Sequence, residues 1–255
     1  MPVVTVASNK LNYEEVGEGT PLVYIAATRF DSGKMWAPYM AQHATGFRVI
    51  LPDPRGLAGS VHVPSIEPRD WVEDFGGLLD ALRIQRVNLA AETLGTRIAT
   101  RFAADHPERV ATLILNGTIA YSSPSGDAAR RANADASGRE QMASALSEER
   151  QRSMETHHGA DWKAVNEFYL TLHERPDFHD FYDLRKVAGR IQAPTLLVRG
   201  DIDDPVHPVA HSAELHQLIP GSWLAIYPNT EFNALRARPE EAWELIRRFI
   251  GEHPE

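Results

Sequence analysis

Hydrophobic positions along the chain follow two alternating patterns. Short apolar runs such as LVYIA at Leu22–Ala26 and FRVIL at Phe47–Leu51 are typical of strands buried on both faces of a sheet. Between such runs, segments such as Asp70–Leu82 carry apolar residues at helical spacing. The other strands expected are Val3–Ala7, Leu11–Val16, Val87–Ala91, Val110–Leu115, Pro194–Val198 and Trp223–Tyr227. The other helices expected are Lys34–His43, Thr96–Ala104 and Glu241–Ile250.

The order of these elements predicts the fold class. Strands separated by helices imply right-handed crossovers, and therefore an α/β fold with a mostly parallel central sheet flanked by helices. The first two strands are an exception, because they follow each other directly and each alternates apolar and polar residues. We expect them to form an antiparallel pair, which ends at the turn residues Gly17, Gly19 and Pro21.

The pattern changes between residues 120 and 191. The stretch Ser122–Gln141 is small and polar, and the helical patterns that follow it contain no strand. We interpret residues 120–191 as a helical cap inserted into an α/β core made of residues 1–119 and 192–255. An insertion after a sheet strand usually covers the pocket at the carboxyl ends of the strands. The alternative is a surface excursion without a role.

Composition narrows the class of protein. The chain has 255 residues, 43% of them hydrophobic, which suits one sizeable core. Its net charge of −9 argues against a nucleic-acid partner. The absence of cysteine excludes disulfides, thiolate catalysis and Cys-ligated zinc. The sequence shows no signal peptide and no apolar run long enough for a membrane span, so we expect a cytoplasmic protein that does not bind membranes.

Four motifs occur in the order of a known family. They are FRVILPDPRGLAGS at Phe47–Ser60, the stretch Asp74–Gly117 around AETLG, APTLLVRGDIDDPVHP at Ala193–Pro208, and PEEAWELIRRFI at Pro239–Ile250. The chain thereby resembles the α/β-hydrolase superfamily, in its compact bacterial esterase, lactonase and C–C hydrolase branch. The resemblance covers nearly the whole chain apart from the expected cap, and it implies an α/β-hydrolase fold.

The family carries a serine nucleophile on a sharp strand–turn–helix elbow, G-x-S-x-G. The matching stretch here is Ala91 to Gly95, which keeps small residues at both ends and places Thr93 at the nucleophile position. Thr93 keeps a hydroxyl, but its β-branched side chain adds a methyl group in a crowded turn.

The family histidine is replaced. It corresponds to the residue seven positions before Pro239, which is Phe232. Phenylalanine cannot accept a proton, and a neutral alcohol needs an adjacent base to act as a nucleophile. Loss of one member of a triad removes most of its acceleration. The resemblance therefore implies that Thr93 and Phe232 do not perform acyl transfer by the usual route.

The family acid corresponds to Asp203 or Asp204, because the loop carries one extra residue. This carboxylate can equally be retained for turn formation, since Asp-Asp-Pro is a good turn sequence. In the oxyanion loop, Ala26-Ala27 stands where the family has His-Gly. Backbone N–H groups of Thr28 and Leu94 can still form an oxyanion hole.

Arg29, which follows Thr28, is unusual in that loop. It is a candidate clamp for a substrate carboxylate or phenolate, and the alternative is a solvent-facing side chain. With Thr28, Leu94 and Phe232, it completes the set of expected substrate-binding residues.

Other residues are candidates for the missing base. Glu231 lies one position before Phe232, and Glu92 lies inside the elbow. Either carboxylate can act as a general base with its pKa raised by an apolar pocket. The alternatives are a surface salt bridge for Glu231 and a structural hydrogen bond for Glu92. A recruited histidine is a further possibility, and the candidates are His157, His158, His173, His179, His207 and His211. No H-E-x-x-H motif occurs, so we expect no metal and no other cofactor.

Three functions follow from these residues. The first is a cofactor-free lyase, cyclase, isomerase or unusual hydrolase with a pocket for a small, partly apolar molecule. The second is a non-catalytic small-molecule-binding protein on a hydrolase scaffold. The third is a weak ester or lactone hydrolase that uses Thr93 with a recruited histidine. The sequence does not indicate the substrate or the oligomeric state.

Overall fold

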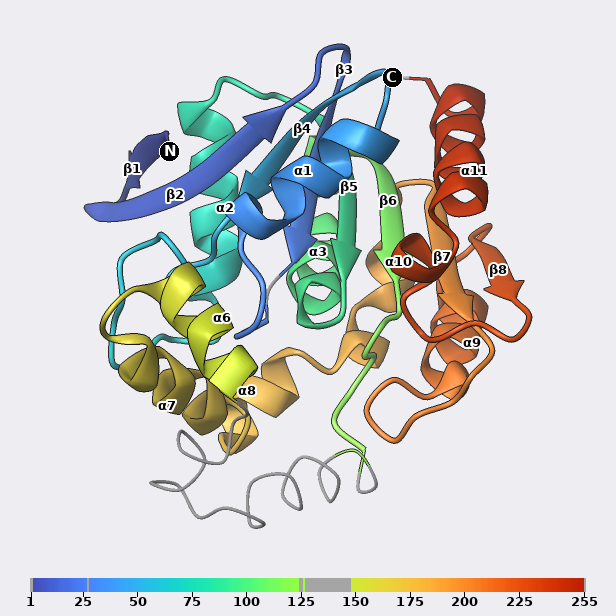
Figure 1. Ribbon diagram of the computed structural model, residues 1–255. Helices are drawn as coiled ribbons and strands as arrows, with labels where there is room; N and C mark the ends of the chain where they lie inside the picture. Colours follow the sequence, from blue (N-terminus) through green and yellow to red (C-terminus); the bar gives the residue numbers. More distant parts are fainter. Residues whose placement is uncertain (1, 27, 124–125, 127–147, 255) are drawn as a thin grey trace.

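The computed structural model describes residues 2–26, 28–123, 126 and 148–254. Their strands form one eight-stranded sheet in the order β1-β2-β4-β3-β5-β6-β7-β8 (Figure 1). The strands are β1 (Val3–Val6), β2 (Asn9–Val16), β3 (Thr20–Ala26), β4 (Phe47–Pro52), β5 (Val87–Glu92), β6 (Val110–Asn116), β7 (Thr195–Gly200) and β8 (Trp223–Tyr227). The longer helices are α1 (Gly33–His43), α2 (Asp70–Ala81), α3 (Leu94–Asp105), α6 (Glu148–His158), α7 (Trp162–Leu172), α9 (Val209–Leu218) and α11 (Pro239–Glu252). Short helices α8 (Pro176–Phe181) and α10 (Ala234–Ala237) complete the set used below.

The sheet confirms the predicted topology. β1 pairs antiparallel with β2, and β2 pairs antiparallel with β4. The pairs from β4 through β3, β5, β6 and β7 to β8 are all parallel. Every residue of β5, β6 and β7 is buried, as expected for largely apolar strands covered on both faces. The chain therefore has the α/β-hydrolase arrangement that the motifs predict.

Two hydrophobic cores cover the two faces of the sheet. One contains apolar side chains of α2, α3, α7 and α9, with Phe102 and Leu215 fully buried. The other contains apolar side chains of α1, α10 and α11, with Trp36 and Trp243 almost fully buried. Because both faces are packed, the open positions for a ligand are the loops at the ends of the strands.

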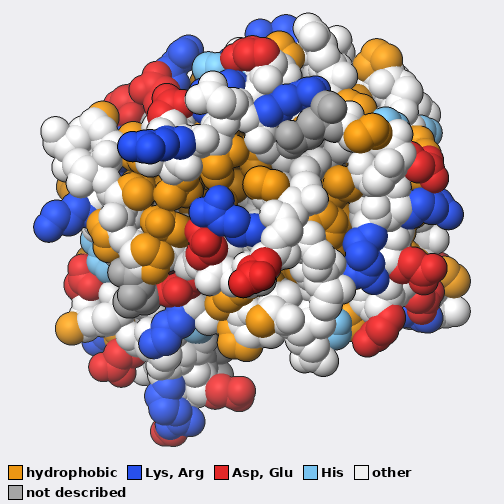
Figure 2. All heavy atoms as spheres, turned by 90° about the horizontal axis from the view of Figure 1, so that it is seen from above, with side chains coloured by type: hydrophobic (Ala, Val, Ile, Leu, Met, Phe, Trp, Pro, Cys, Tyr) orange, Lys and Arg blue, Asp and Glu red, His pale blue; other side chains and the backbone are white. Residues whose placement is uncertain are grey.

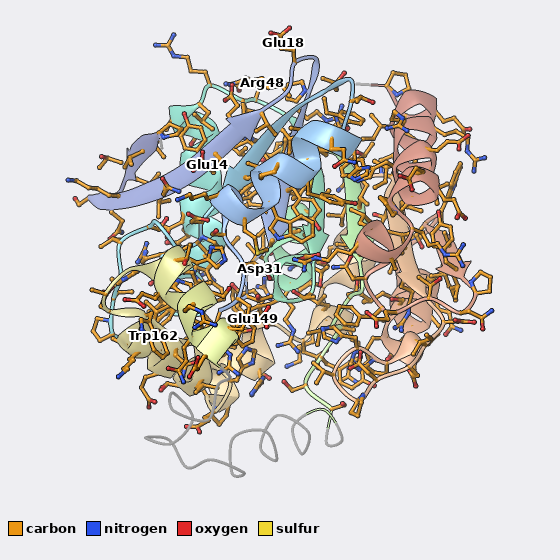
Figure 3. All side chains as sticks on the ribbon, in the orientation of Figure 1. Glu14, Glu18, Asp31, Arg48, Glu149 and Trp162 are labelled. Atoms are coloured by element: carbon orange, nitrogen blue, oxygen red, sulfur yellow. The ribbon has the colours of Figure 1, made fainter. Side chains whose placement is uncertain are left out.

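The segment between β6 and β7 lies at the carboxyl ends of the strands. Its described part contains α6, α7 and α8, at the lower end of the sheet in Figure 1. Figure 3 labels Glu149 and Trp162 on these helices, with Asp31 between them and the sheet. His158 at the end of α6 contacts the loops after β3 and β4. The division at residues 120 and 191, and the role of this segment as a cap, remain predictions, and most of Ser122–Gln141 lies outside the described residues.

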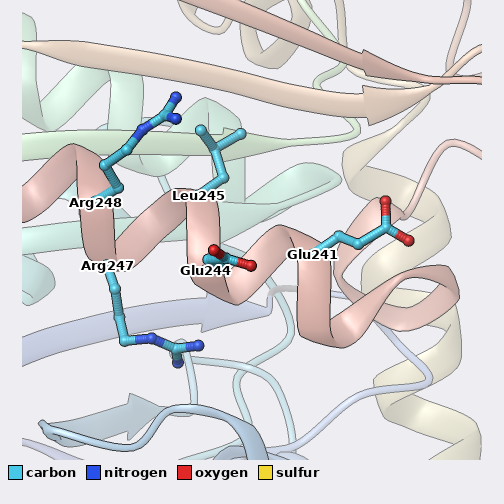
Figure 4. A pocket seen from close by; sticks show the side chains of 5 residues that line it. All are labelled: Glu241, Glu244, Leu245, Arg247 and Arg248. Carbon is cyan, nitrogen blue, oxygen red and sulfur yellow. The ribbon is translucent and has the colours of Figure 1, made fainter.

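The surface carries charges of both signs. Figure 2 shows the face opposite these helices, where acidic, basic and apolar side chains are interspersed. One open hollow lies along α11 and is bordered by charged side chains and Leu245, away from the loops described below (Figure 4). Within the described ranges, no helix is long and apolar enough to cross a membrane. The same residues include no cluster of three or more side chains able to hold a metal ion.

Candidate active site

The elbow lies where β5 meets α3. Thr93 separates the last residue of β5 from the first residue of α3, and its backbone has φ 47° and ψ −119°. A positive φ is strained for a β-branched residue and costs on the order of 1–3 kcal/mol. Gly95 permits this turn, because a Cβ there would lie 2.1 Å from the carbonyl oxygen of Ile25 on β3. The sequence thus keeps a strained turn tightly packed against the neighbouring strand.

The Thr93 hydroxyl is buried and has no hydrogen bond to a described residue. The residue is 8% exposed, and its Oγ1 has no hydrogen-bond partner among the described residues. The backbone around it is held, because the Thr93 N–H donates to the Asn116 carbonyl at 3.3 Å. Leu94 is the first residue of α3, so no residue of that helix can accept its N–H. A hydroxyl and a helix N-terminal N–H therefore lie side by side, which suits an oxygen that carries negative charge.

The loop after β3 contains the other expected oxyanion donor. The Thr28 hydroxyl donates to Asp31 and accepts from the Phe30 N–H at 3.1 Å. Arg29 is half-buried and donates to Asn166 of α7 at 2.8 Å. Its guanidinium also lies 5.9 Å from the centre of the Tyr169 ring. Arg29 therefore joins the β3 loop to α7 instead of projecting freely into solvent.

Glu92 is buried in a polar cluster directly before the elbow. It is 1% exposed, and its Oε2 accepts from the Tyr24 hydroxyl at 2.9 Å and from Asn233 Nδ2 at 2.5 Å. Arg236 of α10 lies 3.9 Å from its other oxygen and forms a closer ion pair, 2.9 Å, with Asp31. These contacts are structural hydrogen bonds, and none of them involves Thr93.

The cluster favours a protonated Glu92. Burial and the charge of Asp31 raise the pKa of Glu92 from 4.5 to about 8, against the opposing effects of Arg236, Tyr24 and Asn233. One arginine thus neutralises Asp31, while Glu92 holds a proton. A raised pKa is also expected for a general base in an apolar pocket. The Glu92 carboxyl, however, accepts its two hydrogen bonds from protein side chains, those of Tyr24 and Asn233.

The position of the missing histidine is filled by an aromatic stack. Phe232 is half-buried and packs against Gly117, whose added Cβ would lie 2.7 Å from the Phe232 ring. Gly117 directly follows Asn116, which binds the Thr93 N–H. The other neighbour of Phe232 is the ring of His207, parallel to within 5° at a centroid distance of 3.8 Å.

The two candidate acids have different contacts. Asp203 is exposed and accepts the Val209 N–H at the start of α9, at 2.6 Å. Asp204 accepts the backbone N–H groups of Val206 and His207 at 2.8 and 2.9 Å, and lies 3.2 Å from the His207 ring Nδ1. Both therefore perform the turn chemistry expected of Asp-Asp-Pro, and Asp204 also holds an imidazole.

The remaining candidate bases are placed elsewhere. Glu231 is exposed, and no hydrogen bond or ion pair of its side chain is found with the described residues. His158 uses both ring nitrogens, accepting from the Ala58 N–H and donating to the Arg29 carbonyl. His157 of α6 forms a hydrogen bond with Ser32, with its Nδ1 2.9 Å from the Ser32 hydroxyl. The remaining candidates are His173, His179 and His211. His179 contacts Ser122 and the His173 carbonyl, and His211 accepts from the Ala120 N–H.

Part of this arrangement was not predicted from the sequence. Tyr24, Asp31, Asn233 and Arg236 surround Glu92, and none was a candidate. Asn233 directly follows the substituted histidine position, which is the one local signal that pointed toward it. The other members come together because β3, β5 and α10 are neighbours in the fold, a relation that no spacing along the chain reveals.

The chain belongs to the α/β-hydrolase fold family, which its residues 21–158 match. Among relatives, serine hydrolase BPHL of Mus musculus is 26% identical, over 97% of this chain and 85% of that protein. The 2-hydroxymuconate semialdehyde hydrolase of a Pseudomonas species is 34% identical, over 48% of this chain and 44% of that protein. These relatives are hydrolases.

Solved structures share the fold at lower identity. A meta-cleavage product hydrolase from Pseudomonas fluorescens superposes with a TM-score of 0.78 at 19% identity, covering 100% of this chain and 98% of the other. The enol-lactonase from Burkholderia xenovorans has a TM-score of 0.76 at 22% identity, covering 98% and 100%. These similarities establish the architecture of the whole described chain.

Proposed function

We propose that this protein is a cofactor-independent enzyme that binds a small, partly apolar carbonyl compound at the Thr93–Leu94 turn and polarises its carbonyl group without covalent attack by Thr93. The observation that carries the proposal is the Thr93 hydroxyl, which is buried on a strained turn and has no partner among the described residues. Such strain persists where the surrounding structure maintains it, and it concentrates at functional sites.

Two hydrogen-bond donors support this assignment. The Thr93 hydroxyl and the Leu94 N–H are adjacent at the N-terminus of α3, a helix of 12 residues. The helix dipole favours negative charge there, and donors placed before the reaction need no reorganisation when the charge develops. A carbonyl oxygen that becomes an enolate or a tetrahedral oxyanion therefore gains most from this position.

The surroundings of Thr93 argue against covalent catalysis. A threonine nucleophile needs a base within hydrogen-bond reach, and the described residues provide none for its hydroxyl. Phe232 occupies the position of the family base, and Glu92 is bonded to Tyr24 and Asn233. The hydroxyl is thus better suited to donate a hydrogen bond than to attack.

The expected substrate class combines a carbonyl with a carboxylate or enol. Hydrolases of 2-hydroxymuconate semialdehyde and of enol lactones are among the relatives and structural neighbours. Arg29, between the β3 loop and α7, is a cation at the edge of the same loops. It is proposed to bind the acidic end of the substrate, as a guanidinium binds a carboxylate.

A matched pair of variants tests the role of the hydroxyl. Thr93→Val keeps the branched shape and removes the hydroxyl, whereas Thr93→Ser keeps the hydroxyl and removes the methyl group. With 2-hydroxymuconate semialdehyde, an enol lactone and p-nitrophenyl acetate as probes, we expect the valine variant to lose about 10²-fold in kcat/KM. The serine variant is expected to stay within about threefold, because the donor remains. Equal activity of the valine variant and the unmodified protein would contradict the proposal.

Labelling separates the proposed chemistry from the alternatives. A fluorophosphonate is expected to leave Thr93 unmodified, as read by intact-protein mass spectrometry. A label on Thr93 would instead indicate a hydrolase in which this residue is the nucleophile. The loss of the family base at Phe232 favours, as the second candidate, a binding protein without catalysis. That candidate predicts tight, Thr93-dependent binding of a carbonyl compound with no turnover of any probe.

A further inference from the structure

The loop between β7 and α9 contains a histidine held from several sides. The His207 backbone N–H donates to Asp204 at 2.9 Å, and the His207 carbonyl accepts from Nη1 of Arg199 at 2.9 Å. Arg199 is fully buried and also donates to the carbonyl groups of Gly200 and Ile202. This arginine therefore ties the beginning and the end of the loop together, and it fixes where His207 lies.

The His207 side chain is oriented as well. Its Nδ1 lies 3.2 Å from Asp204 Oδ2, and its ring lies flat against Phe232 at 3.8 Å. A carboxylate on one edge and an aromatic plane on one face fix both the position and the rotation of the imidazole. Such support is typical of groups that must hold a productive geometry.

The other ring nitrogen has no such partner. No hydrogen bond of His207 Nε2 is found with the described residues, and the side chain is 14% exposed. Because the carboxylate of Asp204 accepts a hydrogen bond from the Nδ1–H group, neutral His207 carries its lone pair at Nε2. The pair thus has the form of an acid-oriented base, with a basic nitrogen directed away from the acid.

Phe232 lies between the His207–Asp204 pair and the residues next to the elbow. The ring of Phe232 contacts His207 on one side and packs on Gly117, next to the residue that binds the Thr93 N–H. His207 therefore lies one stacking distance from the side chain that replaces the family base. Phenylalanine at this position gives the imidazole a flat apolar surface instead of competing with it for Asp204.

We infer that His207, oriented by Asp204, is the proton-transfer residue of this protein. The inference rests on the proposed function, since it needs a carbonyl bound at Thr93 and Leu94. His207 Nε2 takes a proton from water while the water oxygen bonds to the carbonyl carbon. The π electron pair of the C=O bond moves onto the carbonyl oxygen, which Thr93 and Leu94 hold. When that pair returns, the bond to the leaving group breaks and the imidazolium gives its proton to that group. The sum is hydrolysis, which consumes one water and no other reactant.

Ionised Asp204 supports this role. Burial works to raise the pKa of Asp204, but His207 and the backbone N–H groups of His207 and Val206 outweigh it and lower the pKa to about 2. A carboxylate in this state stabilises the imidazolium that forms when His207 accepts the proton. Glu92 cannot serve in this way at neutral pH, because its own carboxyl holds a proton.

The test compares His207→Gln and Asp204→Asn with His216→Gln as the control. His216 is an exposed histidine of α9, so its substitution changes neither the loop nor the elbow. With the probe that the unmodified protein turns over, we expect His207→Gln to lower kcat by about 10²–10³-fold with KM within about threefold. Asp204→Asn is expected to lower kcat at least about tenfold, and His216→Gln to leave it unchanged. Circular dichroism checks that each variant is folded.

Binding of trifluoroacetophenone, followed by fluorine NMR, distinguishes failure of this inference from failure of the proposed function. A kcat within threefold of the unmodified value in folded His207→Gln overturns the role of His207. Binding of the ketone that depends on the Thr93 hydroxyl, without turnover of any probe, also overturns that role and leaves the carbonyl site intact. No binding and no turnover overturn both proposals.

Discussion

Glu92 ends β5 and Asp204 lies in the loop after β7, and the environments of these two carboxyl groups shift their pKa values in opposite directions. Glu92 is enclosed by Tyr24 and Asn233 at the end of β5, and its pKa is raised to about 8. Asp204 lies in the loop after β7 with a side chain 33% exposed, and its pKa is lowered to about 2. Both are desolvated to some degree, so burial alone does not decide the outcome.

The difference comes from the charges nearby. Arg236 lies closer to Asp31 than to Glu92, 2.9 Å against 3.9 Å, so Glu92 shares a cation that another carboxylate already uses. Asp204 has two backbone N–H donors and an imidazole to itself. The neutral carboxyl of Glu92 therefore stabilises the interior next to the elbow, whereas the charged carboxyl of Asp204 is available to orient a base.

The largest expected effect is on folding and concerns Glu92. Glu92→Ala leaves Tyr24 and Asn233 without their shared acceptor and opens a cavity under the elbow. We expect a loss of about 3 kcal/mol in the free energy of unfolding, measured with urea. Glu231→Ala is the control, because Glu231 is exposed, and it should change the free energy by less than about 0.5 kcal/mol. Similar values for the two alanine variants would remove the structural role given to Glu92.

The pH dependence of stability tests the protonation of Glu92. Its folded-state pKa is raised, so the folded protein holds a proton that the unfolded chain releases between pH 4.5 and about 8. The contribution of this group is fully present below about pH 4.5 and is lost as the pH rises through 8. Glu92→Gln cannot ionise, so we expect its free energy of unfolding to gain a few kcal/mol on that of the unmodified protein between about pH 5 and about pH 8.5. Parallel curves of melting temperature against pH for the two proteins would show that Glu92 is ionised in the folded state.

How far the sequence predicts this arrangement depends on whether the signal is local. The buried strands were predicted from apolar runs, and Thr93 was placed on a turn because the small residues Ala91 and Gly95 flank it. The network of Glu92 was not predicted, because its partners Tyr24 and Asn233 lie 68 and 141 positions away and are joined by the sheet. Asp204 and His207 are three residues apart, yet the sequence left Asp203 and Asp204 as equal candidates, because their contacts depend on the direction of the loop, which Arg199 sets from inside the core.

The elbow hydroxyl offers a smaller effect on stability. Thr93 Oγ1 is buried without a hydrogen bond to a described residue, so its desolvation is uncompensated in the free protein. Thr93→Val removes that polar atom and keeps the branched shape, and we expect it to raise the free energy of unfolding by about 1 kcal/mol. Thr93→Ser keeps the hydroxyl and should show no such gain. A gain in stability together with the loss of activity proposed above would identify the hydroxyl as retained for function. Destabilisation by valine would instead mean that the hydroxyl contributes to the fold.

The smallest expected effect is the contribution of Asp204 to stability, which is lost at acidic pH. Its folded-state pKa is lowered, so the stability it contributes is present above the ordinary value of 3.8 and is lost as the pH falls through 2. Because a third of the side chain is exposed, screening by water reduces the contribution, and we expect Asp204→Asn to cost about 0.5–1 kcal/mol at pH 7. The difference should shrink as the pH falls toward 2 and vanish below that pH, where both side chains are neutral. Asp203→Asn keeps an oxygen for the Val209 N–H and serves as the control. An equal cost of the two asparagine variants would show that both aspartates only close the turn, whereas a cost confined to Asp204 would tie its charge to His207.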